Sequence, residues 1–133
     1  MLNRKDALPM LKISTLLIAF AFIAFMPLAA FATPSADEGA AIDHLIAFVR
    51  DSKLEFIRNG VSYPAAAAAD HLASKYAMGK DRLSTADEFI DNVAAKSSMT
   101  GKPYMIVWPD GTSAPSADWL HEELKKYRAG LKK

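Results

Sequence analysis

The sequence contains no cysteine among its 133 residues. Disulfide bonds are therefore excluded, as are thiolate metal ligands and a lipid attached to an N-terminal cysteine. A domain of about a hundred residues buries roughly two-thirds of the surface of its unfolded chain. We therefore expect the core alone to stabilise this protein, without covalent cross-links.

An excess of charge of one sign is also lacking, since 16 lysines and arginines face 15 aspartates and glutamates. The small basic excess lies in the first 32 residues, which hold Arg4, Lys5 and Lys12 but only Asp6 as an acid. The remainder is close to neutral. Such a balance gives no electrostatic reason to expect binding to nucleic acid or to an anionic membrane surface.

The motifs of metal and nucleophilic catalysis are missing. No two of the three histidines share a helical face, and there is no His-Glu-x-x-His pattern and no Gly-x-Ser-x-Gly elbow. The tripeptide Thr100-Gly101-Lys102 lies between a predicted helix and a predicted strand, which is the reverse of a phosphate-binding loop. We therefore predict no metal, no cofactor and no catalytic residue.

One long apolar run occurs, at residues 13–26. It is shorter than the roughly 20 residues that span a bilayer, it follows basic residues, and Pro27 ends it. Ala30 and Ala32 then supply the small side chains of an Ala-x-Ala cleavage site. We predict that residues 1–32 are a cleaved signal peptide and that Thr33 begins the mature chain.

The predicted leader places the protein in the periplasm or outside the cell, with membrane contact only during export. An uncleaved membrane anchor is the alternative interpretation of the same segment. Translation from Met10 rather than Met1 would keep Lys12 and the whole apolar run, so either methionine fits a signal peptide.

Residues 33–133 are predicted to form one domain that begins with a helix. Ser35 and Glu38 have the spacing of a capping box, in which each side chain binds a free backbone N–H group of the other residue. The helix then runs to about Arg50, because apolar residues recur at offsets of three, four and seven. These residues are Ile42, Leu45, Ile46 and Val49.

The strongest local signal is Asn59-Gly60, the pair best suited to the two positive-φ positions of a type I′ turn. It separates two short segments rich in apolar and aromatic residues, which predicts a two-residue hairpin. In that register Phe56 lies opposite Tyr63, and Arg58 lies opposite Val61.

Residues that typically begin or end helices predict the remaining elements. A predicted helix begins after Pro64 and ends at Gly79, and Thr85 with Glu88 forms a second capping box. The sequence then predicts a central apolar strand over 104–108, a turn over 109–111 and a last helix over 116–130. The predicted fold is α+β, with about four helices on a short three-stranded antiparallel sheet.

Four motifs resemble those of the YfeK-like family of small exported proteobacterial proteins. They are Phe56-Ile57-Arg58-Asn59-Gly60, His71-Leu72 with Lys75, Thr85-Ala86-Asp87-Glu88-Phe89-Ile90-Asp91, and Ser97-Ser98-Met99-Thr100-Gly101-Lys102-Pro103-Tyr104. The family is a domain of unknown function. The resemblance therefore implies export and a small α+β domain, and it supplies no catalytic residue.

The polar residues within these motifs form a candidate binding site: Arg58, His71, Lys75, Ser97, Ser98 and Lys102. His71 and Lys75 are four residues apart and share a helix face, so a shallow site for an anion or carboxylate could form there. The alternative is that these groups satisfy the buried ends of helices and strands, as most buried polar groups do.

Together these features favour an exported, noncatalytic binding or interaction module that recognises an envelope protein or a small anionic ligand. Two other classes fit the same sequence. One is a small envelope hydrolase that uses His71 as base and Ser98 as nucleophile. The other is a structural or stress-related envelope factor without a ligand.

Overall fold

The computed structural model describes residues 33–133. The predicted signal peptide and the cleavage residues Ala30 and Ala32 lie outside this part of the chain. Within residues 33–133, none of the helices has the length and apolar character needed to cross a membrane.

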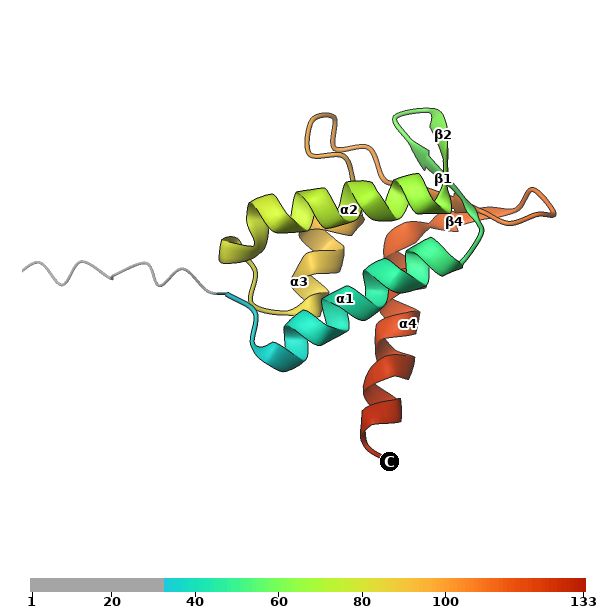
Figure 1. Cartoon of the computed structure of the whole chain (residues 1–133). Coiled ribbons are helices and arrows are strands. Elements are labelled where there is room, and N and C mark those ends of the chain that lie inside the picture. Colours follow the sequence, from blue (N-terminus) through green and yellow to red (C-terminus); the bar gives the residue numbers. More distant parts are fainter. Residues whose placement is uncertain (1–32) are drawn as a thin grey trace, which may run out of the picture. The chain divides into compact units, whose positions relative to one another are not determined.

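The structure combines helices with an antiparallel sheet, which is the α+β class that the sequence predicts (Figure 1). Their order is α1 (Ala36–Asp51), β1 (Glu55–Arg58), β2 (Val61–Pro64), α2 (Ala65–Gly79), η2 (Lys80–Arg82), α3 (Ala86–Phe89), the π-helical turn η3 (Ile90–Ala94), β3 (Met105–Val107), β4 (Ser113–Pro115) and α4 (Ser116–Leu131).

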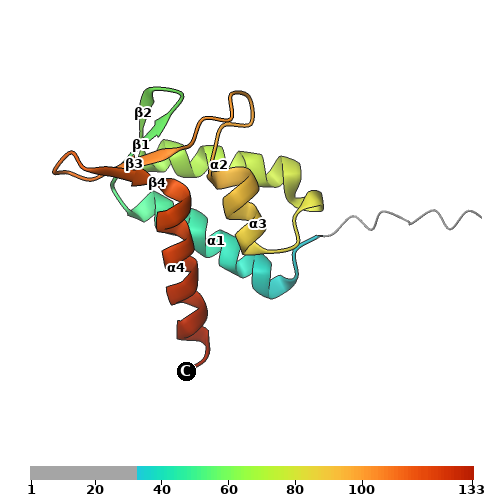
Figure 2. The same ribbon diagram turned by 180° about the vertical axis from the view of Figure 1, so that it is seen from behind.

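The sheet has four strands in the order β2-β1-β3-β4, and every neighbouring pair is antiparallel. The prediction of three strands was therefore wrong by one, because β4 was missed. This strand has only three residues, Ser-Ala-Pro, which offer neither apolar alternation nor β-branched side chains. The predicted internal position of the 104–108 strand is confirmed, since β3 lies between β1 and β4 (Figure 2).

The predicted hairpin is confirmed in turn and register. Phe56 pairs with Tyr63 and Arg58 pairs with Val61. Asn59 and Gly60 have φ values of 51° and 78°, the left-handed region that a type I′ turn requires at both positions. The turn therefore directs the side chains of both strands to fixed faces of the sheet.

We predict that Gly60→Val lowers the free energy of unfolding by about 1 to 3 kcal/mol, because a β-branched residue is strained at positive φ. No atom lies within 4 Å of the position that a Cβ would take at Gly60, so the strain is in the backbone. Gly39→Val in α1 is the control, since Gly39 has the same open space in a helical conformation. Urea denaturation of both variants measures the difference, and equal midpoints would contradict the assigned turn.

The two predicted capping boxes form only in half. Ser35 and Thr85 accept hydrogen bonds from the backbone N–H groups of Glu38 and Glu88, at 3.3 and 3.1 Å. The reciprocal bonds go elsewhere. The Glu88 carboxylate accepts from the Ser84 N–H, and the Glu38 carboxylate accepts from the Ala86 N–H, each at 2.6 Å. Glu38 thus links the start of α1 to the start of α3, because a carboxylate is stabilised at a helix N-terminus.

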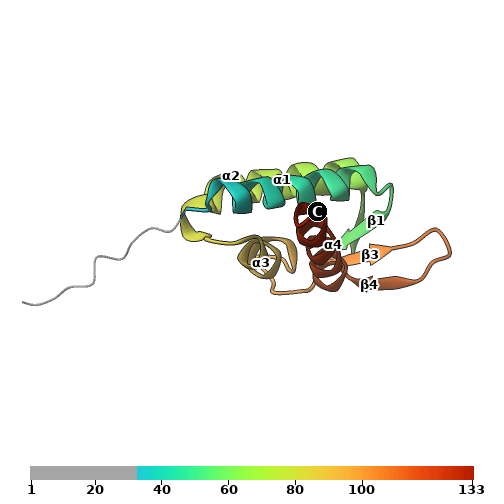
Figure 3. The ribbon, with the colours of Figure 1, turned by 90° about the horizontal axis from the view of Figure 1, so that it is seen from below.

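Helices α1 and α2 lie side by side as one layer over α3, α4 and the sheet (Figure 3). The core lies between these layers. Its largest fully buried side chains are Phe89, Ile42, Leu45, Ile90, Ile106, Leu120, Leu124 and Val49. The apolar stripe predicted for the first helix is confirmed at Ile42, Leu45 and Val49, whereas Ile46 is only partly buried.

Candidate functional site

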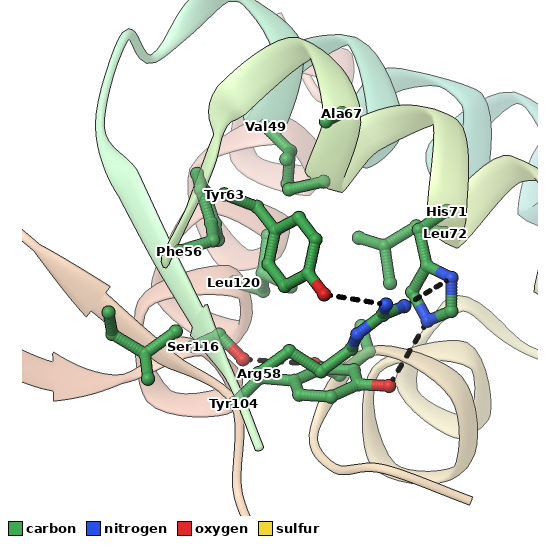
Figure 4. A pocket seen from close by; sticks show the side chains of 13 residues that line it. Val49, Phe56, Arg58, Tyr63, Ala67, His71, Leu72, Tyr104, Ser116 and Leu120 are labelled. Atoms are coloured by element: carbon green, nitrogen blue, oxygen red, sulfur yellow. Dashed lines mark hydrogen bonds between the residues drawn. The ribbon is translucent and has the colours of Figure 1, made fainter. Parts of the chain in front are cut away.

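A cavity of about 200 Å³ lies between the first turns of α2 and the sheet. Apolar side chains form most of its wall, among them Val49, Phe56, Leu72 and Leu120 (Figure 4). Polar side chains from four segments border it: Arg58 of β1, Tyr63 of β2, His71 of α2 and Tyr104 before β3. The cavity is therefore amphipathic, with an apolar interior and one polar side.

Two direct strand-to-helix connections hold the walls of this cavity. Helix α2 follows β2 without a loop residue, and α4 follows β4 in the same way. A proline stands at each junction, Pro64 with φ −67° and Pro115 with φ −57°. Proline fixes φ near the value that a first helical turn needs, so each helix leaves the sheet in a set direction.

Arg58 occupies the polar side of the cavity. Its Nη2 donates to the Tyr63 hydroxyl at 3.1 Å, its Nη1 lies 2.8 Å from His71 Nδ1, and its guanidinium carbon lies 4.6 Å from the centre of the Tyr63 ring. Within residues 33–133, no carboxylate forms a salt bridge with Arg58. A partly buried cation thus faces an apolar cavity with neutral partners only.

The contacts of His71 identify its protonation state. Arginine is always protonated and donates, so His71 Nδ1 accepts from Arg58 and the ring proton is on Nε2. His71 Nε2 then donates to the Tyr104 hydroxyl at 3.3 Å. Burial, with the charges of Arg58 and Lys75, lowers the pKa of His71 below its ordinary value of 6.5. The ring is therefore neutral at pH 7.

Lys75 shares the helix face of His71, as predicted. Its ammonium group, however, binds backbone carbonyls at the C-terminal end of η3. Its Nζ donates to the carbonyl of Val93 at 2.6 Å, to that of Lys96 at 3.2 Å and to the Tyr104 hydroxyl at 3.3 Å. A cation is favoured there by the helix dipole and by the unpaired carbonyls of the last turn. Burial and then the Arg58 charge lower the pKa of Lys75.

The remaining carbonyls at the end of η3 also have partners from other elements. The Ser116 hydroxyl donates to the carbonyl of Ala94, and the Tyr104 N–H donates to that of Ala95, both at 2.9 Å. Together with the Lys75 contacts, these bonds satisfy four successive carbonyls. Lys75 therefore fits the structural alternative that the sequence left open.

Ser97 also has a structural role, in joining two turns. It is 5% exposed, and its hydroxyl oxygen accepts from the Asn59 side-chain amide at 3.2 Å and from the Thr100 N–H at 3.3 Å. The Thr100 hydroxyl donates back to the Asn59 side-chain oxygen. This cluster attaches the hairpin turn to the loop at residues 97–101.

Ser98 and Lys102 stay apart from the other predicted site residues. Both side chains are exposed, and neither makes a side-chain hydrogen bond within the described part of the chain. Ser98 lines a groove beside His71, yet both ring nitrogens of His71 face other groups. The geometry therefore forms no nucleophile–base pair between Ser98 and His71.

That groove has a volume of about 350 Å³ and adjoins the cavity, because Arg58, Tyr63, His71 and Tyr104 line both. Beyond these four residues it is lined by Asn59, Val61, Lys75, Met78, Ser97, Ser98 and Met99. The lining contains two cations and no acidic residue. The groove is hereafter called the outer groove.

Tyr63 and Tyr104 belong to the site although they were not predicted as site residues. Tyr63 was predicted as a cross-strand partner of Phe56, which is correct, but its hydroxyl also meets Arg58. Tyr104 was placed in a central strand and is 7% exposed, with its hydroxyl facing His71 and Lys75. A phenol in a buried segment needs a hydrogen-bond partner, and that need was the available signal.

The lowered pKa of His71 predicts a pH-dependent stability. Because the unfolded chain takes up this proton near pH 6.5 and the folded chain only at lower pH, the contribution of His71 is complete above about pH 6.5 and is lost as the pH falls through the folded pKa. His71→Asn keeps an acceptor toward Arg58 but cannot titrate. Its stability should fall less than that of the wild type between about pH 7.5 and about pH 5.5 in urea denaturation. Identical losses would contradict the assignment.

Metal ligands do not gather in this structure: among residues 33–133, no group of three or more histidines and acidic residues lies close enough to hold an ion.

The comparisons with known proteins give the following matches. The model of a family of unknown function (DUF5329) matches residues 36–128. An uncharacterized protein, YfeK of Salmonella typhimurium, is 40% identical over 80 residues, which cover 59% of this chain and 67% of YfeK. No solved structure matches the chain.

Proposed function

Because the chain belongs to the DUF5329 family, whose function is unknown, we propose its function from the geometry of the cavity. The proposed function is that of an exported, noncatalytic binding module. Its ligand is a small molecule in which a compact apolar group is joined to a carboxylate. The single observation that carries this proposal is the apolar cavity of about 200 Å³ beside Arg58, a cation without an acidic partner in residues 33–133.

The size of the cavity limits the ligand. An apolar cavity of about 150 Å³ can hold benzene, whereas pockets for drug-sized molecules are about 300 to 1,000 Å³. A cavity of about 200 Å³ therefore suits one aromatic ring or a short branched chain. Burial of this group supplies a non-directional part of the affinity, roughly in proportion to the apolar area removed from water.

The chemistry of Arg58 selects the head group. Its present partners are a neutral imidazole and a phenol, whereas a carboxylate would bring the opposite charge and two acceptor oxygens to the same donors. The planar guanidinium also matches a carboxylate in bidentate geometry. His71 next to it gains a reason to take up a proton when an anion is bound, so we expect tighter binding at lower pH.

The hydrolase interpretation gains nothing from this geometry. A base must offer a free nitrogen lone pair to the nucleophile, and the only lone pair of neutral His71 accepts from Arg58. A structural factor without a ligand would leave the cavity empty and the partly buried cation without a role. Export rests on the predicted leader, and the mass of the exported protein tests whether it begins at Thr33.

Calorimetric titration with phenylacetate tests the binding proposal, with benzyl alcohol as the uncharged probe. Arg58→Gln should weaken phenylacetate binding about tenfold or more and leave benzyl alcohol nearly unaffected. Arg50→Gln is the matched control, because Arg50 is exposed and pairs with Asp70 at 2.6 Å.

A second pair of variants tests the cavity itself. Ala67 lines the cavity and Ala66 does not, although both are exposed on the first turn of α2. Ala67→Leu should abolish binding of both probes, while Ala66→Leu should leave both unchanged. Equal binding by all four variants, or no binding of either probe to the wild type, would refute the proposal.

A further inference from the structure

The outer groove gathers most of the exposed large apolar side chains of residues 33–133. Val61, Met78 and Met99 are 52%, 82% and 95% exposed, and all three line it. The fourth, Leu131, lies at the end of α4. Methionine side chains are flexible and polarizable, so a surface containing them adapts to apolar groups of different shapes.

The groove and the cavity meet at Arg58, Tyr63, His71 and Tyr104. A carboxylate bound to Arg58 would therefore stand at the boundary between them. An apolar group attached to that carboxylate would point into the cavity, and any longer part of the ligand would continue into the outer groove. A ligand that uses both spaces must branch close to its carboxylate.

The last residue of a polypeptide has this arrangement, because its carboxylate, its side chain and the preceding chain are all attached to one Cα atom. We propose that the outer groove binds the C-terminal segment of a partner protein that ends in a large apolar residue. This inference rests on the proposed function, since the terminal side chain fills the cavity and the terminal carboxylate binds Arg58. Capture of a C-terminal carboxylate is a recurring mode of peptide recognition.

Charge and chemistry support a peptide as the occupant. The groove lining holds Arg58 and Lys75 and no acidic residue, so it complements the negative C-terminus. The lining holds the polar side chains of Asn59 and Ser98 as well as apolar ones, which suits a chain with peptide groups between its side chains. A long acyl chain fits less well, because it is unbranched beyond its carboxylate and can enter only one of the two spaces.

Calorimetric titration of the full-length chain tests this inference with three probes. These are the peptide Gly-Ser-Gly-Ala-Phe with a free carboxylate, the same peptide with a C-terminal amide, and N-acetylphenylalanine. The free peptide should bind about tenfold more tightly than N-acetylphenylalanine, and amidation should remove about tenfold of its affinity or more. The double variant Met78→Ser with Met99→Ser should remove the advantage of the peptide without changing the affinity for N-acetylphenylalanine. Leu131→Ser is the matched control.

The outcomes separate the two proposals. If the free peptide binds no more tightly than N-acetylphenylalanine, or the methionine double variant has no effect, the peptide inference fails while the small-ligand function stands. If a medium-chain fatty acid binds more tightly than the peptide, the occupant is a lipid and the inference is also overturned. If neither N-acetylphenylalanine nor phenylacetate binds, both proposals fail.

Discussion

Replacing Phe89 with alanine is expected to lower the free energy of unfolding by about 3 to 5 kcal/mol, the usual cost of removing a large aromatic side chain from a core. Phe89 ends α3 and is fully buried, and its ring meets that of Tyr76 on α2 edge to face, with centroids 5.7 Å apart. Removal of the ring would leave a cavity where α2 and α3 pack. The cavity persists because the surrounding helices can relax into it only in part.

Phe48→Ala is the control for this prediction. Phe48 is only partly buried and packs against Trp119, with ring centroids 4.5 Å apart at the edge of the core. Its removal should cost about 1 to 2 kcal/mol, from lost apolar burial and one aromatic pair. Chemical denaturation of both variants measures the two costs. Equal costs would show that Phe89 does not hold the centre of the core.

Replacing Lys75 with methionine is expected to lower the free energy of unfolding by about 1 to 3 kcal/mol. Methionine keeps most of the apolar stem, so the loss comes from the carbonyls of Val93 and Lys96 and the hydroxyl of Tyr104, which lose their donor. A binding residue at the surface would have no such cost. The measurement therefore distinguishes the two interpretations of Lys75.

Lys102→Met is the matched control, because Lys102 is exposed and its side chain makes no hydrogen bond within residues 33–133. Its stability should stay within about 0.5 kcal/mol of the wild type. Urea denaturation gives both values. Similar midpoints for the Lys75 and Lys102 variants would mean that water replaces the ammonium group at the end of η3 without cost.

Elements with a local cause could be predicted from the sequence. The hairpin depends on Asn59-Gly60, whose backbone preference acts within four residues, and its register follows from the turn. The β4 strand has no local signal, since Ser113 to Pro115 become a strand only by pairing with β3. The first capping box is incomplete for a related reason: the Glu38 carboxylate accepts from the Ala86 N–H, which is 48 residues away.

The candidate site shows the same division. His71 and Lys75 share a helix face and both contact the Tyr104 hydroxyl. Their roles differ because Lys75 also binds carbonyls at the end of η3, which helical spacing cannot reveal. Ser97 acts within its own loop and on the hairpin turn. The cavity was not predicted at all, because it is the space left between side chains of seven segments, and packing rather than pattern determines its size.

The two strand-to-helix junctions at Pro64 and Pro115 determine how a ligand could enter. No loop residue separates strand from helix at either junction, so neither junction offers a hinge. Entry then depends on rotation of side chains such as Arg58, which is faster than the microsecond-to-millisecond closure of domains or lids. Association should therefore vary little among related ligands, and their affinities should differ mainly in how long each complex lasts.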